Sequence, residues 1–261
     1  MFYSPNFSFD GIDNDMMDVI LVTTANTDIL NTIGTTYIET VKAENTRTDN
    51  PYYLLDSKGT TETLLLEFAY VDLKDNSPLP WDEEKIDEIV NWLYKESFKP
   101  FVSYDNDEIT YYLKATKIYK KFNHEMKGML EVEFQPYTAY GYKYFEKKIQ
   151  CEDTIETKII NECTTSSEFY EPIIEVKALE SGNIEIENLS IKEDEALIIE
   201  GIEKDDKIII DNFTYTVQNE LGENKFLLVN RNWIRLRKGK NILKITGNCE
   251  VVIKCNYPKI L

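Results

Sequence analysis

Short runs of alternating apolar and polar residues constrain the fold of this chain more than any other feature of its sequence. In the clearest run, residues 129–135, Leu130, Val132 and Phe134 share one parity and two glutamates share the other. Because successive side chains of a strand point to opposite faces, this spacing predicts a half-buried β-strand. We expect further strands at Leu64–Val71, Ile109–Ala115, Ile184–Ile186, Leu197–Ile199, Lys207–Asp211, Phe213–Val217, Trp233–Arg237 and Val251–Cys255. Many short strands separated by turns favour a β-sandwich or barrel.

One segment has helical spacing instead. Between Asp82 and Lys95 the apolar residues recur three or four positions apart, which is typical of a helix with a single apolar stripe. Asp82 suits the N-cap, and the two glutamates that follow it complement the helix dipole. Pro100 prevents a long continuation. We expect this helix to cover one face of a sheet with its stripe of Ile86, Ile89, Val90 and Leu93.

The composition changes between residues 137 and 170, where a tyrosine-rich stretch gives way to acidic and then hydroxyl-bearing residues. A chain of 261 residues is long enough for two domains with separate cores. We therefore expect a mainly β protein with an α+β domain over residues 1–145, a linker over 146–164 and an all-β sandwich over 165–261.

The net charge of −18 argues against an ordinary nucleic-acid binder, because Lys and Arg supply most of the affinity for phosphates. Two interpretations remain open: a solvated surface that keeps the protein soluble, or a surface that must not adhere to DNA. No apolar run approaches the ~20 residues of a membrane span, and Met1–Asn6 does not resemble a secretion signal. We expect a protein that is made in a cytosol and leaves it, if at all, by cell lysis.

The sequence offers few groups for catalysis or metal binding. A catalytic triad would have to use the one histidine, His124, which lies in a polar run typical of a turn. Phosphate-binding loops are absent, and acidic residues are too many for a catalytic pair to be argued from spacing. Two runs that resemble parts of a calcium loop, Asp13–Asp15 and Asp105–Asp107, lack its glycine and its terminal glutamate and are better explained as turns. We expect no catalytic residue, metal or cofactor.

The four cysteines, Cys151, Cys163, Cys249 and Cys255, form no C-x-x-C pair. Neither a zinc knuckle nor a thioredoxin-type redox site has its usual spacing. We expect free thiols, with Cys249 and Cys255 as small buried residues beside a strand.

The strongest candidate for a binding surface is the run that starts at Trp233. If the run is a strand, Trp233, Arg235 and Arg237 point outward and the two residues between them point into the core. An outward Trp with two arginines is a composition found at protein interfaces and at sugar-stacking sites. The alternative is a Trp packed under a loop, beside arginines whose stems lie along apolar surface.

A second candidate is a polar loop between two strand-like segments. It is too hydrophilic to bury and longer than a tight hairpin needs, so we hypothesise an exposed assembly loop that contacts a neighbouring ring, with an idle loop as the alternative. It consists of Glu44, Asn45, Thr46, Arg47, Thr48, Asp49 and Asn50.

Several segments, in order, resemble the distal tail protein family of long-tailed, non-contractile phages. Phe7–Ile12 is similar to the family's opening F-x-F-x-G segment, and the predicted helix is followed by Phe98–Val102 and Tyr111–Ala115, as in the family. The more acidic Asp13–Asp18 departs from the pattern and leaves the exposure of that segment open. Further similar segments are Met129–Tyr137, Tyr170–Val176, Ile208–Asp211 and Gly239–Leu243.

The resemblance implies a tail-tube-like N-terminal domain, a galectin-like C-terminal sandwich and six copies in a ring, which pairs back to back with a second ring in isolation. Such a ring is a virion component, assembled in the host cytoplasm. It joins the tail tube protein to the tail-associated lysin or tail fibre protein and to receptor-binding proteins, with no chemistry and no membrane contact. DNA crosses its channel without tight binding. The alternatives are a stand-alone carbohydrate-binding sandwich and a glycan hydrolase.

Two hypotheses follow from this resemblance. The first is that residues 1–145 close the ring, because pairing of sheets around a ring removes exposed strand edges. The second is that acidic residues outnumber basic ones on the face that lines the channel, so that the duplex slides through instead of being held.

Overall fold

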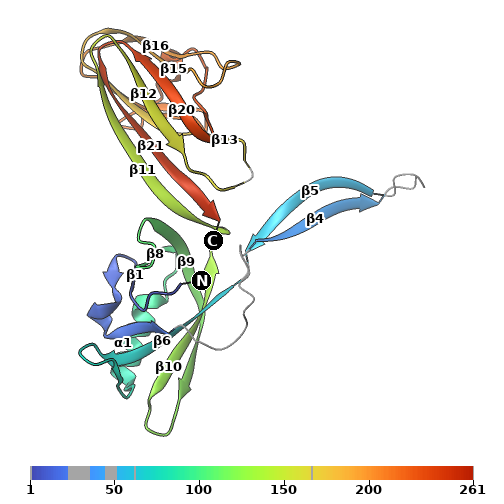
Figure 1. The fold of residues 1–261 in the computed structure, drawn as a ribbon, viewed down its shortest axis with the longest axis vertical. Helices are drawn as coiled ribbons and strands as arrows, with labels where there is room; N and C mark the ends of the chain where they lie inside the picture. The colour runs from blue at the N-terminus through green and yellow to red at the C-terminus, as the bar shows by residue number, and fades with distance from the viewer. Residues whose placement is uncertain (1, 23–35, 45–51, 62, 166, 261) are drawn as a thin grey trace. The chain divides into compact units, whose positions relative to one another are not determined.

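The computed structural model describes residues 2–22, 36–44, 52–61, 63–165 and 167–260, with the backbone alone for 36–44, 52–61 and 260. The chain divides into two compact units (Figure 1). Unit 1 runs to Tyr142 and includes the C-terminal end of the chain, and unit 2 spans Lys143–Lys259. Strands dominate both units, which confirms the predicted mainly β fold.

Unit 1 is an antiparallel sheet covered on one face by a helix. Its central strands follow the order β2-β1-β8-β9-β10-β6-β3, with β7 beside β6. The strands are β1 (Phe7–Phe9), β2 (Ile12–Asp13), β3 (Val19–Val22), β4 (Thr36–Glu44), β5 (Tyr52–Thr61), β6 (Leu64–Asp72), β7 (Ser77–Pro78), β8 (Lys99–Ser103), β9 (Ile109–Phe122) and β10 (Gly128–Pro136), with the 3-10 helix η1 (Asn14–Met17).

The alternation in β10 sets the core of unit 1. Leu130 lies opposite Phe68 and Val132 opposite Leu66, and all four side chains are buried. Phe7 and Phe9 of β1, both fully buried, join the same core. The F-x-F segment of the sequence therefore has a packing role.

The helix α1 (Glu83–Leu93) forms where the sequence predicts it. The Asp82 carboxylate caps the helix by accepting a hydrogen bond from the Lys85 backbone N–H at 2.7 Å. Ile86, Ile89 and Leu93 are buried against the sheet, together with Trp92, which the predicted stripe did not include.

Strands β4 and β5 form an antiparallel pair of their own. Thr36 lies opposite Thr61 and Glu44 opposite Tyr52, with a bulge between Val41 and Lys42. Within the described residues neither strand pairs with any other.

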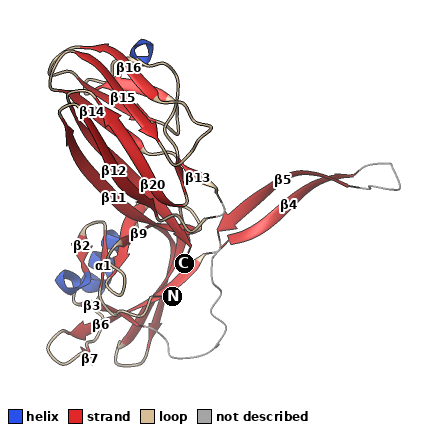
Figure 2. Cartoon of the chain, turned by 45° about the horizontal axis from the view of Figure 1, so that its top comes forward, coloured by secondary structure: helices blue, strands red, loops and turns tan. Residues whose placement is uncertain are grey.

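Unit 2 is a two-sheet sandwich (Figure 2). One sheet has the order β18-β17-β14-β21-β11 and the other β12-β20-β15-β16, with β13 and β19 as a separate pair. The elements are β11 (Tyr140–Cys151), β12 (Thr154–Asn161), β13 (Phe169–Tyr170), β14 (Ile173–Ala178), β15 (Gly182–Asn188), β16 (Leu197–Ile202), β17 (Lys207–Asp211), β18 (Thr216–Asn219), the 3-10 helix η2 (Phe226–Leu228), β19 (Leu236–Arg237), β20 (Gly239–Thr246) and β21 (Cys249–Ile260). The buried side chains of both sheets form one apolar core.

The structure corrects three sequence-based predictions. Residues 146–164 are not a linker, because they hold most of β11 and all of β12. The expected strand Phe213–Val217 begins only at Thr216, since the Asp211 carboxylate accepts hydrogen bonds from the backbone N–H groups of residues 213 and 214 and makes a turn there. The expected strand Trp233–Arg237 is reduced to its last two residues.

Candidate assembly surfaces

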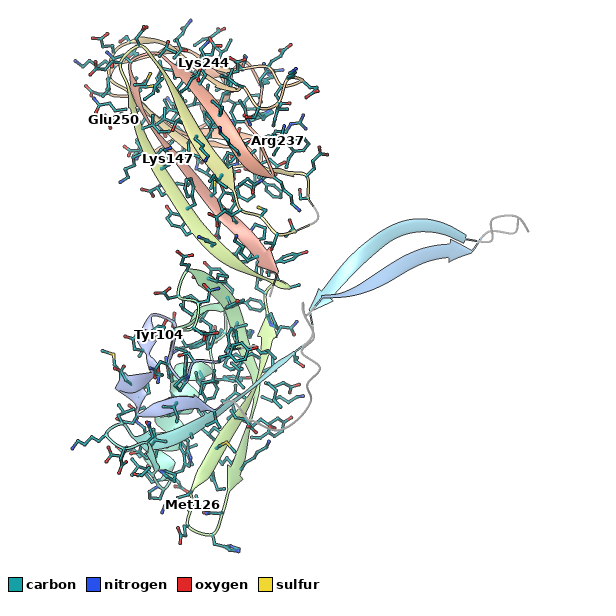
Figure 3. The ribbon with its side chains drawn as sticks, in the orientation of Figure 1. Tyr104, Met126, Lys147, Arg237, Lys244 and Glu250 are labelled. Atoms are coloured by element: carbon teal, nitrogen blue, oxygen red, sulfur yellow. The ribbon has the colours of Figure 1, made fainter. Side chains whose placement is uncertain are left out.

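Chemistry-bearing groups do not converge in the described part of the chain. His124 is exposed in the turn between β9 and β10. Met126 of the same turn lies at the tip of the hairpin (Figure 3). Asn14, from one of the calcium-like runs, is buried and bonds the backbone of Phe7 and Val19. Among the described residues no group of three His, Cys, Asp or Glu side chains is arranged for a metal, and no described helix is long and apolar enough to cross a membrane.

The face of the unit 1 sheet opposite the helix is lined by interlocked charges. Glu131 of β10 lies directly opposite Glu67 of β6, an arrangement that repels unless a cation lies between the two. Lys121 of β9 supplies that cation, 2.9 Å from Glu67 and in contact with Glu131. These carboxylates, Glu131 first, raise the pKa of Lys121. We call the set Glu67, Lys117, Lys121, Glu131 and Glu133 the charged face.

The charged face arises from alternation in the sequence. In β10 the glutamates have the parity opposite to that of the core residues. In β9 a bulge between Ala115 and Lys117 reverses the alternation, so that Lys117 and Lys121 lie on the charged face, and Lys117 pairs with Glu133 at 2.7 Å. The sequence shows this alternation in β10, but it does not show which charges pair, because the partners lie on different strands. Three carboxylates against two ammonium groups give the charged face a small acidic excess.

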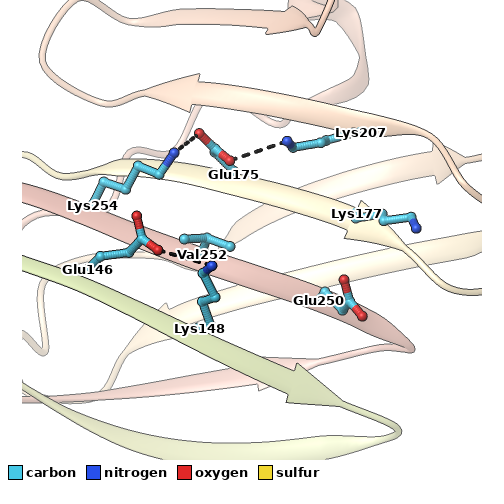
Figure 4. A pocket seen from close by; sticks show the side chains of 8 residues that line it. All are labelled: Glu146, Lys148, Glu175, Lys177, Lys207, Glu250, Val252 and Lys254. Carbon is cyan, nitrogen blue, oxygen red and sulfur yellow. Dashed lines mark hydrogen bonds and ion pairs between the residues drawn. The ribbon is translucent and has the colours of Figure 1, made fainter.

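A second charged region is a shallow groove on the outer side of the β11–β21–β14–β17 sheet (Figure 4). Glu175 lies between two cations, in contact with Lys254 and 3.4 Å from Lys207. Glu146 pairs with Lys148 at 3.4 Å and accepts a hydrogen bond from the Tyr144 hydroxyl at 2.6 Å. Most of the lysines that line the groove are therefore matched by carboxylates of the same sheet, as on a solvated sheet face.

This groove gives a pH-dependent prediction. Burial raises the pKa of Glu175, but Lys254 and Lys207 outweigh this effect and lower the pKa below its ordinary value of 4.5. The ionised carboxylate therefore stabilises the fold at pH values above 4.5, and this stabilisation is lost as the pH falls through the lowered pKa. At pH 7 we expect Glu175→Gln to lower the free energy of unfolding by about 1–2 kcal/mol. Urea unfolding should show that the difference in the free energy of unfolding between wild type and Glu175→Gln narrows below pH 4.5. Glu250→Gln, an exposed neighbour on the same sheet, should change little at either pH.

Trp233 is partly buried and packs against the unit 2 core. Its ring lies 5.2 Å from that of Tyr215 and 6.0 Å from that of Phe226. Tyr215 is exposed and has a positive φ of 56°, a strained conformation for a bulky residue. This geometry matches the packed-Trp alternative more closely than an outward strand residue.

The two arginines differ in how they are held. Arg235 makes a bidentate ion pair with Asp194, with its closest contact at 2.6 Å, and its guanidinium lies 4.1 Å above the ring of Phe169. Arg237 is exposed at the surface of unit 2 (Figure 3) and donates a hydrogen bond to the Ser190 carbonyl at 3.3 Å. Ile234 and Leu236 are buried between them, as the alternation predicts. The three candidate side chains are thus not one outward row.

Buried asparagines hold the segment that carries these residues. The Asn212 side chain accepts a hydrogen bond from the Ile234 N–H at 2.8 Å, and Asn188 donates to the Arg235 carbonyl at 2.7 Å. Asn161 donates to the Leu236 carbonyl at 2.9 Å, and Asn241 bonds both backbone groups of Arg237. Side chains thus take the place of a neighbouring strand from 234 to 237, which explains why the predicted strand is short.

The predicted assembly loop mostly lies outside the described residues. Glu44 ends β4, and residues 45–50 are not described.

Two protein-family models match nearly the whole chain. One, described as a phage tail protein N-terminal domain, matches residues 2–136, and the other, described as a phage tail C-terminal domain, matches residues 140–255. The chain belongs to this family of phage tail proteins. The resemblance carried by the ordered motifs is confirmed at this level, and the join between the two matches falls close to the boundary between the units at Tyr142.

This tail protein is similar to the SPbeta prophage-derived uncharacterized protein YomH of Bacillus subtilis (strain 168), with 24% identity over 227 residues that cover 82% of this chain and 84% of the relative. Its fold is similar to that of the SPP1 Dit protein, described as a paradigm of the hub adsorption apparatus in phages that infect Gram-positive bacteria. The TM-score is 0.66 at 14% identity, over 97% of this chain and 98% of that one. A chain of the phage p2 baseplate is more distant, with a TM-score of 0.47 at 11% identity over 95% of this chain and 97% of that one.

Proposed function

We propose that this tail protein is the distal hub of a phage tail, a hexameric ring at the end of the tail tube. The observation that carries the proposal is a two-unit fold shared with the SPP1 Dit protein over nearly the full length of both chains. The ring would join the tail tube protein to the tail-associated lysin or tail fibre protein and to receptor-binding proteins. Its role would be structural, without catalysis or a cofactor.

In this proposal unit 1 closes the ring and unit 2, as the galectin-like sandwich, carries attached proteins. The charged face of unit 1 would line the channel that DNA crosses. Its three carboxylates and two lysines are already paired with one another, so little free positive charge remains there to hold phosphates. A ring structure with a channel rich in unpaired Lys and Arg, or tight DNA binding at moderate salt, would contradict this part of the proposal.

Electron microscopy of the purified full-length protein, with light scattering for its mass, tests the ring. We expect six-fold rings from the full chain and from residues 1–145, and monomers from residues 143–261. The second fragment starts at unit 2 because a cut at 165 would remove β11 and β12 from its sandwich. A full chain that stays monomeric and binds sugar would favour the carbohydrate-binding alternative. Rings from 143–261 alone would reverse the assignment of the units.

A variant with a shortened loop tests the predicted assembly loop at 44–50. We propose that it contacts a neighbouring ring, so replacing residues 45–51 with a two-residue turn should leave the isolated ring intact and prevent tail completion. The β4–β5 pairing on both sides gives such a turn a defined place to close the hairpin. If phage with the shortened loop build infectious tails at normal yield, the loop is idle.

A further inference from the structure

Two of the four cysteines face each other across neighbouring strands. In the β12–β20 pair Thr154 lies opposite Thr246, and the chain continues from both residues through connections of equal length. Residues 152–153 lead back to β11, and residues 247–248 lead on to β21. Extending the antiparallel register by three residues through both connections places Cys151 opposite Cys249.

Three observations support this placement. β11 and β21 are neighbours in one sheet, and the Gly247 N–H donates to the Asp153 carbonyl at 2.8 Å, so the pairing continues into the connections. Both thiols are buried in the unit 2 core. Residues that lie opposite each other on antiparallel strands have Cα atoms about 4.5–5.5 Å apart, which is within the range that a disulfide requires.

We propose that Cys151 and Cys249 are a latent disulfide, which is reduced during assembly in a cytosol and closes under oxidising conditions. Both cysteines are free in this structure. Cys163 and Cys255, also free, have no such relation, because Cys163 follows the end of β12 instead of lying on a strand opposite Cys255.

The oxidant we name is a low-molecular-weight disulfide. The Cys151 thiolate attacks one sulfur of that disulfide, forms a mixed disulfide and releases one small thiol. The Cys249 thiol loses its proton to water, attacks Cys151 Sγ and expels the second small thiol. Two protein thiols are oxidised, and one external disulfide is reduced to two thiols.

Burial of the two thiols slows this thiol–disulfide exchange. It raises the pKa of Cys249 to about 12 and also raises that of Cys151, so few thiolates exist in the closed fold. Cys151, next to the exposed Glu152 and Asp153, is the thiol that local opening of the connections reaches first. Exchange in the folded protein should therefore be slow, whereas during refolding both thiols are accessible.

The disulfide would enclose about 100 residues, most of unit 2. A loop of this length strongly restricts the unfolded chain, so the closed form should resist unfolding. The expectation that the disulfide closes after the virion leaves the cell rests on the proposed function. The disulfide itself does not depend on that function.

Trypsin separates the four cysteines, which makes the test direct. They fall on four different peptides, 149–158, 159–177, 245–254 and 255–259. The full-length protein is refolded in a buffer of oxidised and reduced glutathione and digested without reduction. We expect peptide 149–158 linked to 245–254, a Tm roughly 10 °C above that of the reduced protein, and loss of this difference on adding a reductant.

Two variants complete the test. Cys151→Ala with Cys249→Ala should abolish both the link and the response of Tm to oxidation, whereas Cys163→Ala should keep both. Linkage of any other pair, glutathione adducts alone or four thiols that stay reduced after refolding would overturn the proposal. Ring formation is not read in this experiment, so its outcome is independent of the proposed hub function.

Discussion

Asn212→Ala is expected to lower the free energy of unfolding by about 2–4 kcal/mol, although it removes only a small polar side chain. Asn212 is fully buried. Its amide donates to the Pro172 carbonyl at 2.6 Å and its oxygen accepts from the Ile234 N–H at 2.8 Å. The substitution leaves the buried Ile234 N–H without a partner, which costs about 1–3 kcal/mol. It also leaves the Pro172 carbonyl with only the longer bond, 3.4 Å, from the backbone N–H of residue 212.

Urea unfolding followed by circular dichroism measures this effect, with an expected drop of about 2 M in the midpoint of the unit 2 transition. Asn256→Ala is the matched control: it makes the same change at an exposed position of β21 and should shift the midpoint by no more than about 0.3 M. A midpoint for Asn212→Ala as close to wild type as that of the control would mean that the asparagines do not hold the 234–237 segment.

Trp92→Ala should destabilise unit 1 to a similar extent, by about 3–5 kcal/mol, because it opens a large cavity between the helix and the sheet. The Trp92 ring stacks on Phe7 at 5.7 Å and meets Phe9 edge-on at 6.2 Å. Its indole N–H donates to the Phe9 carbonyl at 3.0 Å, so the side chain ties α1 to the first strand by packing and by a hydrogen bond.

Two further substitutions separate these contributions. Trp92→Phe keeps a ring but loses the bond to the Phe9 carbonyl, so it should cost about half as much as Trp92→Ala. Tyr94→Ala, two residues further along and largely exposed, should cost less than about 1 kcal/mol. Thermal unfolding of the three variants tests this order, and equal losses for Trp92→Ala and Tyr94→Ala would contradict it.

Local patterns predicted the elements that local interactions determine. The alternation at 129–135 identified β10 because its burial depends only on parity, and Asp82 marked the start of α1 because capping acts within four residues. The prediction of a linker over 146–164 is wrong, because it treats the acidic residues that follow Cys151 as a boundary. They form only a short connection between two strands of the same sandwich.

The candidate surface around Trp233 could be predicted only in part. Alternation correctly placed Ile234 and Leu236 in the core. It could not show that Arg235 is held by Asp194, about 40 residues away, or that Asn161, Asn188 and Asn212, about 20 to 75 residues away, pair the backbone. Partners so distant in sequence leave no periodic signal.

In the segment 234–237, which buried asparagines hold, the course of the backbone does not depend on which side chains face outward. The hydrogen bonds that Asn161, Asn188, Asn212 and Asn241 make to residues 234–237 all go to main-chain atoms, and every amino acid except proline presents the same atoms. The exposed Arg237 can therefore be exchanged over generations while the backbone keeps its course, whereas Arg235 is tied to Asp194. At this position the surface of unit 2 can change its charge and its shape without a new fold.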